Sequence, residues 1–303
     1  MQLLDGKGIA ATIRAELNVE IRALTGEVGR PPGLAVVLAG EDKPSRTYVR
    51  NKERACAEVG IRSETLYLPA DVGQDELLAL IDALNTRPDV DGILVQLPLP
   101  GGLDSRVCLE RIDPSKDVDG FHPVNMGRLM LGLPGLRPCT PAGVMEMLKR
   151  CSLTPAGKRA VVLGRSNIVG KPLAVMLGAK GIDATVTVCH SASPDSAAYC
   201  KDADFVFPAM GRPESVRGDM LKPGAVVVDI GISVTDRGLR GDADFASISA
   251  VASAASPVPG GVGPMTIAML MGNTVQAFKA RCRPKCRPFS GNLRKLNLWH
   301  MPT

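Results

Sequence analysis

The chain has 303 residues, of which 45% are hydrophobic, 22% charged and only 3% aromatic, and it is long enough for two domains of roughly 150 residues each. No run of about 18 apolar residues is free of charge, which excludes a membrane span. Because Asp5, Lys7 and Arg14 stand where a signal peptide needs an apolar run, we expect a cytoplasmic protein.

The net charge of +5 is confined to the end of the chain. Seven basic residues and no acidic residue follow position 278, so residues 1–278 hold 29 of the 36 basic residues against all 31 acidic ones. The segment 283–303 has neither helical nor strand periodicity, and we predict a basic, disordered tail. Such a tail can attract nucleic acid or a membrane, but we favour a dispensable extension and expect neither partner.

Metal binding is not expected either. The eight cysteines are scattered, no C-x-x-C pair occurs and only three histidines are present. Cysteines inside apolar segments behave as small hydrophobic residues. We therefore predict free thiols and no metal site.

In the first half of the chain, apolar runs alternate with helical patterns. Strand-like runs cover 33–40, 64–69 and 92–100, and helical patterns cover 45–60 and 75–85. This alternation is typical of a parallel sheet with helices on both faces.

The first of these helices contains an unusual lysine. Ser45 is a plausible N-cap and Gly60 a plausible stop, and between them one stripe repeats at helical spacing, formed by Tyr48, Lys52, Ala55 and Val59. Lys52 thus stands in a row that should be buried. It either has a chemical role, or it extends its ammonium group to the surface or pairs with a carboxylate.

A second series of strands and helices follows the Gly- and Pro-rich segment 126–141. Its strand-like runs are 159–164, 184–190, 203–211 and 224–231, with a helix over about 168–180. The last helix, from Pro264 to about Cys282, is apolar on one face and can return to the first domain. We predict an α/β fold with two domains, an N-terminal domain over 1–138 and a Rossmann-like domain over 139–262, followed by the returning helix over 263–282.

The sequence VVLGRSNIVGKP (161–172) has the form of a nucleotide-binding turn. Gly164 ends a strand and Gly170 begins a helix, where backbone N–H groups attract phosphate. The match to G-x-G-x-x-G is incomplete, because Ser166 and Val169 replace the second and third glycines. A tight turn without a ligand is the alternative.

The end of the next strand favours NADP over NAD. NAD sites of this type usually carry an acidic residue there, whereas this strand ends in CHSAS (189–193). Arg165, His190 and Ser191 can instead receive a 2′-phosphate.

Glycines are concentrated in PVPGGVGPMT (257–266). Gly260 and Gly263 permit close approach of the backbone to a ligand, and Pro264 suits the first turn of the last helix. A loop without a ligand is the alternative.

Seven segments, in this order and spacing, resemble the bifunctional methylenetetrahydrofolate dehydrogenase/methenyltetrahydrofolate cyclohydrolase family: SRTYVRNK (45–52), VQLPLP (95–100), KDVDGFHPVNMG (116–127), PCTPAG (138–143), VVLGRSNIVGKP (161–172), VVVDIGI (226–232) and PVPGGVGPMT (257–266). The resemblance covers about residues 1–280. It implies a homodimer of two-domain protomers, with NADP on the second domain and a tetrahydrofolate derivative in the cleft.

The resemblance also implies roles for individual residues. Lys52 would be the catalytic lysine, Gln96 its hydrogen-bond partner, Tyr48 the ring that stacks on the folate and Asp119 the carboxylate that holds the pterin. Further substrate contacts would come from Pro259, Gly260 and Gly263. Cofactor contacts would come from Gly164, Arg165, Ser166, His190, Ser191 and Ile232.

The implied reactions place different demands on these residues. Hydride transfer to the nicotinamide needs positioning, whereas hydrolysis of the methenyl cation needs a group that moves protons, which suits a lysine. Without the resemblance, Gln96 reads as a polar residue that ends a strand and Asp119 as a turn residue.

Two residues depart from the family pattern. Pro208 and Met210 replace smaller residues before Gly211, and Pro208 removes an N–H from a predicted strand. These departures bear on cofactor affinity.

Two alternative hypotheses stand beside the folate enzyme: an NADP-linked oxidoreductase of similar architecture acting on another small substrate, and a non-enzymatic binding protein that uses the basic tail.

Overall fold

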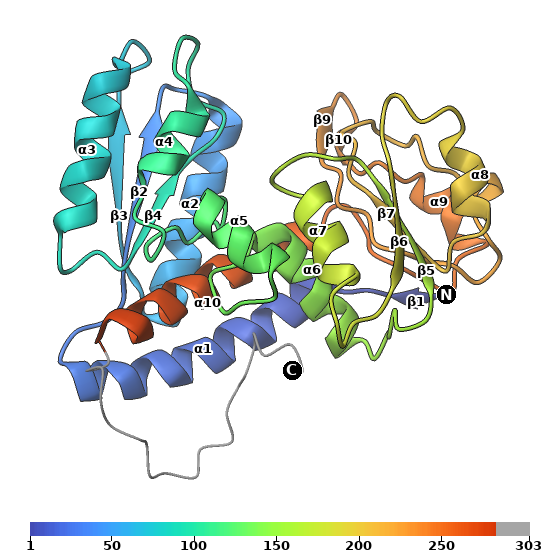
Figure 1. Ribbon diagram of the computed structural model, residues 1–303, viewed down its shortest axis with the longest axis horizontal. Helices are drawn as coiled ribbons and strands as arrows, with labels where there is room; N and C mark the ends of the chain where they lie inside the picture. Colours follow the sequence, from blue (N-terminus) through green and yellow to red (C-terminus); the bar gives the residue numbers. More distant parts are fainter. Residues whose placement is uncertain (283–303) are drawn as a thin grey trace.

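The computed structural model describes residues 1–282, with the backbone alone at 43 and 44; the predicted basic tail, 283–303, lies outside the described residues. Two α/β units lie side by side, and two long helices, α1 (Gly6–Val28) and α10 (Val262–Cys282), run beneath the first unit toward the second (Figure 1). Within the described residues, no helix is both long and apolar enough to cross a bilayer.

The first unit is built on a parallel sheet of three strands in the order β3-β2-β4. The central strand β2 (Gly33–Ala39) is buried at every position, as expected for a strand with helices on both faces. Its neighbours are β3 (Arg62–Leu68) and β4 (Gly92–Val95). The helices of this unit are α2 (Lys43–Val59), α3 (Gln74–Thr86) and α4 (Ser105–Arg111).

The start of α2 differs from the prediction. Asp42, not Ser45, is the N-cap, and its carboxylate accepts hydrogen bonds from the Ser45 backbone N–H at 2.9 Å and from the Ser45 hydroxyl at 2.7 Å. The helix therefore begins three residues earlier than expected, and Ser45 supplies an N–H to the cap instead of being the cap. The predicted stop is confirmed, because Gly60 adopts the left-handed conformation with φ 88°.

The second unit contains a six-stranded parallel sheet in the order β1-β11-β8-β7-β5-β6. These strands are β1 (Gln2–Leu3), β11 (Ala254–Ala255), β8 (Val226–Val227), β7 (Phe205–Pro208), β5 (Arg159–Leu163) and β6 (Thr185–Cys189). The chain runs from β5 outward to β6 and then crosses back to β7, so the direction of strand addition reverses between β5 and β7. In open α/β sheets, ligands bind in the crevice at such a switch point.

Helices and a hairpin surround this sheet. The helices are α5 (Pro123–Met130), α6 (Cys139–Arg150), α7 (Gly170–Leu177), α8 (Ser196–Lys201) and α9 (Phe245–Ser249), with a 3₁₀ turn at Gly218–Met220. Strands β9 (Ser233–Thr235) and β10 (Gly238–Arg240) form an antiparallel hairpin outside the sheet.

Pro208 occupies the last position of β7 and is buried. Its carbonyl accepts a hydrogen bond from Ile230 N at 2.9 Å, and the following N–H, of Ala209, continues the ladder to Leu163 O at 2.8 Å. The proline therefore lacks a donor only where the strand ends, and the sheet tolerates it there.

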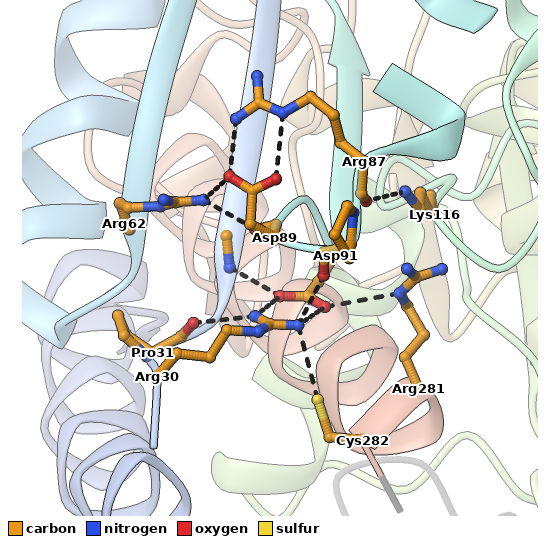
Figure 2. A network of polar contacts seen from close by, with 11 residues as sticks. Arg30, Pro31, Arg62, Arg87, Asp89, Asp91, Lys116, Arg281 and Cys282 are labelled. Carbon is orange, nitrogen blue, oxygen red and sulfur yellow. Dashed lines mark hydrogen bonds and ion pairs between the residues drawn. The ribbon is translucent and has the colours of Figure 1, made fainter. Parts of the chain in front are cut away.

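The last helix, α10, packs against α1, α6 and α2, so the predicted return of the chain to the first unit is confirmed. Its end is anchored by Asp91, whose side chain is 0% exposed (Figure 2). Arg30 forms a two-pronged ion pair with this carboxylate at 2.7 and 2.9 Å, and Arg281 approaches it at 3.6 Å. Gly33 N also donates to Asp91, at 2.9 Å, so the same carboxylate holds the start of the central strand β2.

Candidate functional site

The lysine that stands out in the sequence lies inside the protein. Lys52 is only 9% exposed, and its Nζ donates a hydrogen bond to Gln96 Oε1 at 2.9 Å. Gln96 directly follows β4, and its amide nitrogen donates to the neighbouring Leu97 O at 2.6 Å, which orients the amide oxygen toward the lysine. Within the part of the chain that the structure describes, the lysine therefore neither reaches the surface nor forms an ion pair with a carboxylate.

Asp119 lies close enough to Lys52 for the charge of the lysine to act on its carboxylate. Burial raises the pKa of Asp119 to about 6, the positive charge of Lys52 opposes that rise, and the neighbouring Asp117 adds to it. Among the described residues, no group donates a hydrogen bond to the Asp119 carboxylate, and its side chain is partly exposed. It is therefore free to accept hydrogen bonds from a ligand.

The turn role weighed for Asp119 belongs instead to Asp117. This carboxylate accepts hydrogen bonds from the backbone N–H groups of Gly120, Phe121 and His122 at 3.1, 3.2 and 2.8 Å. Asn125 Nδ2 also donates to it, at 2.9 Å. Asp117 thus fixes the backbone of the DVDG turn and leaves the side chain of Asp119 uncommitted.

A cavity of about 590 Å³ opens between α2 and the glycine-rich segment 257–264. Its walls include Tyr48 and Ile232, which are 40% and 39% exposed. Pro259 and Gly260 come from the loop before α10, and Gly263 comes from the first turn of α10. Two partly exposed apolar side chains facing an open cavity are suited to a flat aromatic ligand.

The switch-point crevice in the second unit has the features of a phosphate-binding turn. Gly164 adopts φ +127°, and a β-carbon there would overlap the carbonyl of Ala209. A β-carbon on Gly170 would overlap the carbonyl of Gly164, so the turn and the start of α7 touch directly. The Ser166 hydroxyl accepts hydrogen bonds from Val169 N and Gly170 N at 3.2 and 3.4 Å, which holds the turn in shape.

The side chains predicted for a 2′-phosphate lie on neighbouring strand ends. Leu163 pairs with Cys189, and Gly164 N donates to Cys189 O at 2.8 Å. Arg165 follows the first strand, and His190 and Ser191 follow the second. Arg165 and Ser191 are exposed and no acidic residue ends β6, so this donor set fits NADP.

The predicted residues thus form three groups. Lys52, Gln96 and Asp119 gather where α2 meets the end of β4; Tyr48, Ile232, Pro259, Gly260 and Gly263 line the cavity; and Gly164, Arg165, Ser166, His190 and Ser191 surround the crevice. The first group does not line the cavity, but Tyr48 lies one helical turn from Lys52 and connects the two. Among the described residues, no cluster of three or more metal-ligating side chains occurs.

Sequence reasoning missed Asp229, which is 3% exposed and also borders the cavity. Burial raises its pKa to about 7, against the lowering effect of three backbone hydrogen bonds. An aspartate after an apolar strand and before a glycine is the signal that could have identified it, but VVVDIG is equally compatible with an ordinary turn.

Fold and site together define a dinucleotide-binding α/β protein with a second, lysine-containing site next to its cavity. Residues 4–119 match the tetrahydrofolate dehydrogenase/cyclohydrolase catalytic domain, and residues 138–282 match the NAD(P)-binding domain of the same family. The chain belongs to the tetrahydrofolate dehydrogenase/cyclohydrolase family.

Individual relatives agree with this assignment. The bifunctional protein FolD of Nitratidesulfovibrio vulgaris (strain DP4) is 66% identical over 284 residues, which make up 93% of this chain and 99% of the relative. The crystal structure of FolD from Campylobacter jejuni is similar with a TM-score of 0.90 at 49% identity, and 93% of this chain and 99% of that chain are covered. The Trypanosoma brucei enzyme, solved with NADP cofactor and inhibitor, has a TM-score of 0.88 at 41% identity, over 92% of this chain and 98% of that one.

Proposed function

We propose that this chain is a bifunctional enzyme of folate one-carbon metabolism. It oxidises 5,10-methylenetetrahydrofolate to the 5,10-methenyl compound with NADP⁺ and hydrolyses that product to 10-formyltetrahydrofolate. Family membership supports the reaction pair. The observation that carries the proposal is the hydrogen bond between Lys52 and Gln96 beside the uncommitted carboxylate of Asp119.

In this proposal Lys52 moves protons during hydrolysis. Water attacks the methenyl carbon between N5 and N10, and its proton passes to the amine of Lys52. The lysine then returns a proton to N5 as the bond between that nitrogen and the carbon breaks, while the adduct's hydroxyl proton leaves to solvent and its oxygen becomes the carbonyl of the formyl group on N10. Gln96 holds the Lys52 nitrogen through its amide oxygen, so the amine stays aimed at one place through both steps.

Asp119 and Tyr48 hold the substrate in this proposal. An ionised carboxylate accepts two parallel N–H bonds from the aminopyrimidine edge of a pterin. Tyr48 keeps 40% of its surface exposed, and its ring can stack on the bicyclic part of the substrate. Pro259, Gly260 and Gly263 form the opposite wall, where the two glycines, which lack a β-carbon, leave room for the ligand.

The second unit holds NADP in this proposal. Bound NADP⁺ supplies the hydride acceptor for the dehydrogenase reaction. Gly164 and Ser166 form the turn for its phosphates, while Arg165, His190 and Ser191 bind the 2′-phosphate. Ile232, exposed in the cavity wall, faces the nicotinamide.

The remaining parts of the proposal concern the setting of the enzyme. We infer a cytoplasmic homodimer that acts on tetrahydrofolate derivatives and needs neither a membrane nor nucleic acid. The family supports the substrate class. Sedimentation of the purified chain tests the dimer.

A spectrophotometric assay tests the function. Purified protein is mixed with 5,10-methylenetetrahydrofolate and either NADP⁺ or NAD⁺, and the absorbances of reduced cofactor and of methenyltetrahydrofolate are followed separately. We expect reduced cofactor to form faster with NADP⁺, and added methenyltetrahydrofolate to disappear without cofactor. Cofactor binding with neither reaction would favour an oxidoreductase that acts on another substrate.

A further inference from the structure

Two buried aspartates take no part in the proposed chemistry. Asp242 is 0% exposed and Asp229 is 3% exposed. Among the described residues, no lysine or arginine forms an ion pair with either, and their carboxylates are held by backbone N–H groups. Burial of two anions without a cation is unfavourable, and here hydrogen bonds from backbone N–H groups offset that cost.

Asp242 organises the loop that follows β7. Its Oδ2 accepts hydrogen bonds from Met210 N at 2.5 Å and Gly211 N at 3.0 Å, and its Oδ1 accepts one from Arg212 N at 2.7 Å. Three consecutive N–H groups therefore converge on one carboxylate, and the loop 210–212 is curved around it.

This loop borders the switch-point crevice. It begins directly after Ala209, whose N–H donates to Leu163 O at 2.8 Å. The carbonyl of Ala209 lies so close to Gly164 that a β-carbon on that glycine would overlap it. The loop 210–212 therefore continues from backbone that contacts the nucleotide-binding turn at the edge of the crevice.

Asp229 holds Asp242 in place. Its Oδ1 accepts hydrogen bonds from Asp242 N at 3.0 Å and Gly231 N at 3.1 Å, and its Oδ2 accepts one from Ala243 N at 2.8 Å. A β-carbon on Gly231 would overlap the Asp242 carboxylate, and one on Gly241 would overlap that of Asp229. The two aspartates and two glycines thus form one interlocked unit that joins the end of β8 to the loop 210–212.

We propose that Asp242 is a positioning residue for the nicotinamide cofactor, because it holds the loop 210–212 as one wall of the crevice. The inference rests on the proposed function. Hydrolysis of methenyltetrahydrofolate uses no cofactor, so loss of this wall weakens cofactor binding and dehydrogenation while cyclohydrolase turnover is retained.

The test compares Asp242→Ala and Asp242→Asn with a matched control. Asp244→Ala removes a carboxylate of the same segment that caps α9 through Ser247 N and does not contact the loop 210–212. For each protein the Kd of NADPH is measured by direct fluorescence titration, beside the KM for NADP⁺, cyclohydrolase turnover without cofactor, and Tm.

We expect Asp242→Ala to weaken NADPH binding at least about tenfold, since three backbone donors lose their acceptor. Asp242→Asn keeps one carbonyl oxygen and fills the same volume, so its loss should be smaller, about threefold to tenfold. Cyclohydrolase turnover should stay within about twofold of wild type in both variants, and the control should bind NADPH as wild type does.

NADPH binding that is unchanged in the Asp242 variants would overturn the proposal. So would a parallel loss of cyclohydrolase turnover and cofactor binding, because that pattern indicates general structural damage. If Asp242→Ala does not fold, Asp242→Asn decides by the same criteria. Wild-type protein that binds NADPH but does not oxidise methylenetetrahydrofolate contradicts the proposed function, and the binding comparison still tests Asp242.

Discussion

Lys52 and Gln96 are joined by a hydrogen bond of 2.9 Å that links the buried side of α2 to the carboxyl end of β4. The bond gives a buried amine one fixed direction. It also leaves the remaining positions around the Lys52 nitrogen available for a ligand.

Lys52→Met should separate the two activities. Methionine has a similar length and helix propensity, so α2 should persist while the proton carrier is lost. General acid–base assistance contributes typically about 10²–10⁴-fold, and cyclohydrolase turnover should fall by that range. Dehydrogenase activity should fall less, because hydride transfer moves no proton. Both are measured in the separate absorbance assays; a variant with cyclohydrolase turnover near wild type would mean that the lysine has no such role.

Arg165→Ala should alter cofactor choice. The exposed guanidinium follows β5 beside the end of β6, where no acidic residue is present. Its removal should raise the KM for NADP⁺ by at least about tenfold, since charge-assisted hydrogen bonds to phosphate are strong, and change the KM for NAD⁺ little. The control is Lys171→Ala, which removes a cation on α7 whose Nζ donates a hydrogen bond to Asn167 Oδ1. Equal losses for both cofactors would contradict the assignment of Arg165.

Substrate affinity should fall on acidification through about pH 6. The pKa of Asp119 is raised to about 6 by burial, so the carboxylate is ionised above that pH and protonated below it. A protonated Asp119 loses half of its capacity to accept N–H bonds from the pterin. We expect the KM for methylenetetrahydrofolate to rise as pH falls from 7 to 5, and Asp119→Asn to remove this dependence. A wild-type KM that is flat over that range would exclude the role.

The same group has a predictable effect on stability. Because its pKa is higher in the folded protein than in the unfolded chain, the folded state binds the proton more tightly, and stability declines as pH rises from about 4 to 6. Asp119→Asn cannot ionise and should show a shallower decline. Stability against urea, measured at several pH values, checks this sign.

Asp91→Ala should destabilise the protein strongly. The carboxylate is fully buried and holds Arg30, Arg281 and the start of β2 (Figure 2). Removal of one partner of a buried ion pair typically costs 3–5 kcal/mol, and we expect about 3 kcal/mol here because Arg30 keeps 31% of its side chain exposed. Asp82→Ala, which breaks a solvent-exposed pair with Arg111, should lower the stability far less than Asp91→Ala. Urea unfolding of both variants provides the comparison, and similar losses would contradict the special role of Asp91.

Local pattern predicted the elements well where it was strongest. Strand β2 and the last helix follow directly from apolar runs and helical spacing, and Gly60 from its conformational freedom. The cap of α2 was misplaced, because Asp42 and Ser45 are both good capping residues and only the backbone geometry selects between them.

Long-range contacts were beyond what local pattern contains. The resemblance supplied Lys52 and Gln96 as partners, although 44 positions separate them and spacing alone could not pair them. The interlocked pair of Asp229 and Asp242 was missed, since each reads locally as a turn aspartate beside a glycine. Asp91 likewise gives no local sign that two arginines from opposite ends of the chain converge on it.

The edge strand β1 limits where the protein can be divided into recombinant fragments. Gln2 N donates to Ser253 O at 2.7 Å and Leu4 N to Ala255 O at 2.9 Å, so the first residues of the chain complete the sheet of the second unit before α1 enters the first. A recombinant fragment that starts at residue 139 leaves β11 unpaired on one side, an open edge that invites self-association. The cofactor-binding half is therefore best expressed with residues 1–5 grafted back, and neither half is an independent module.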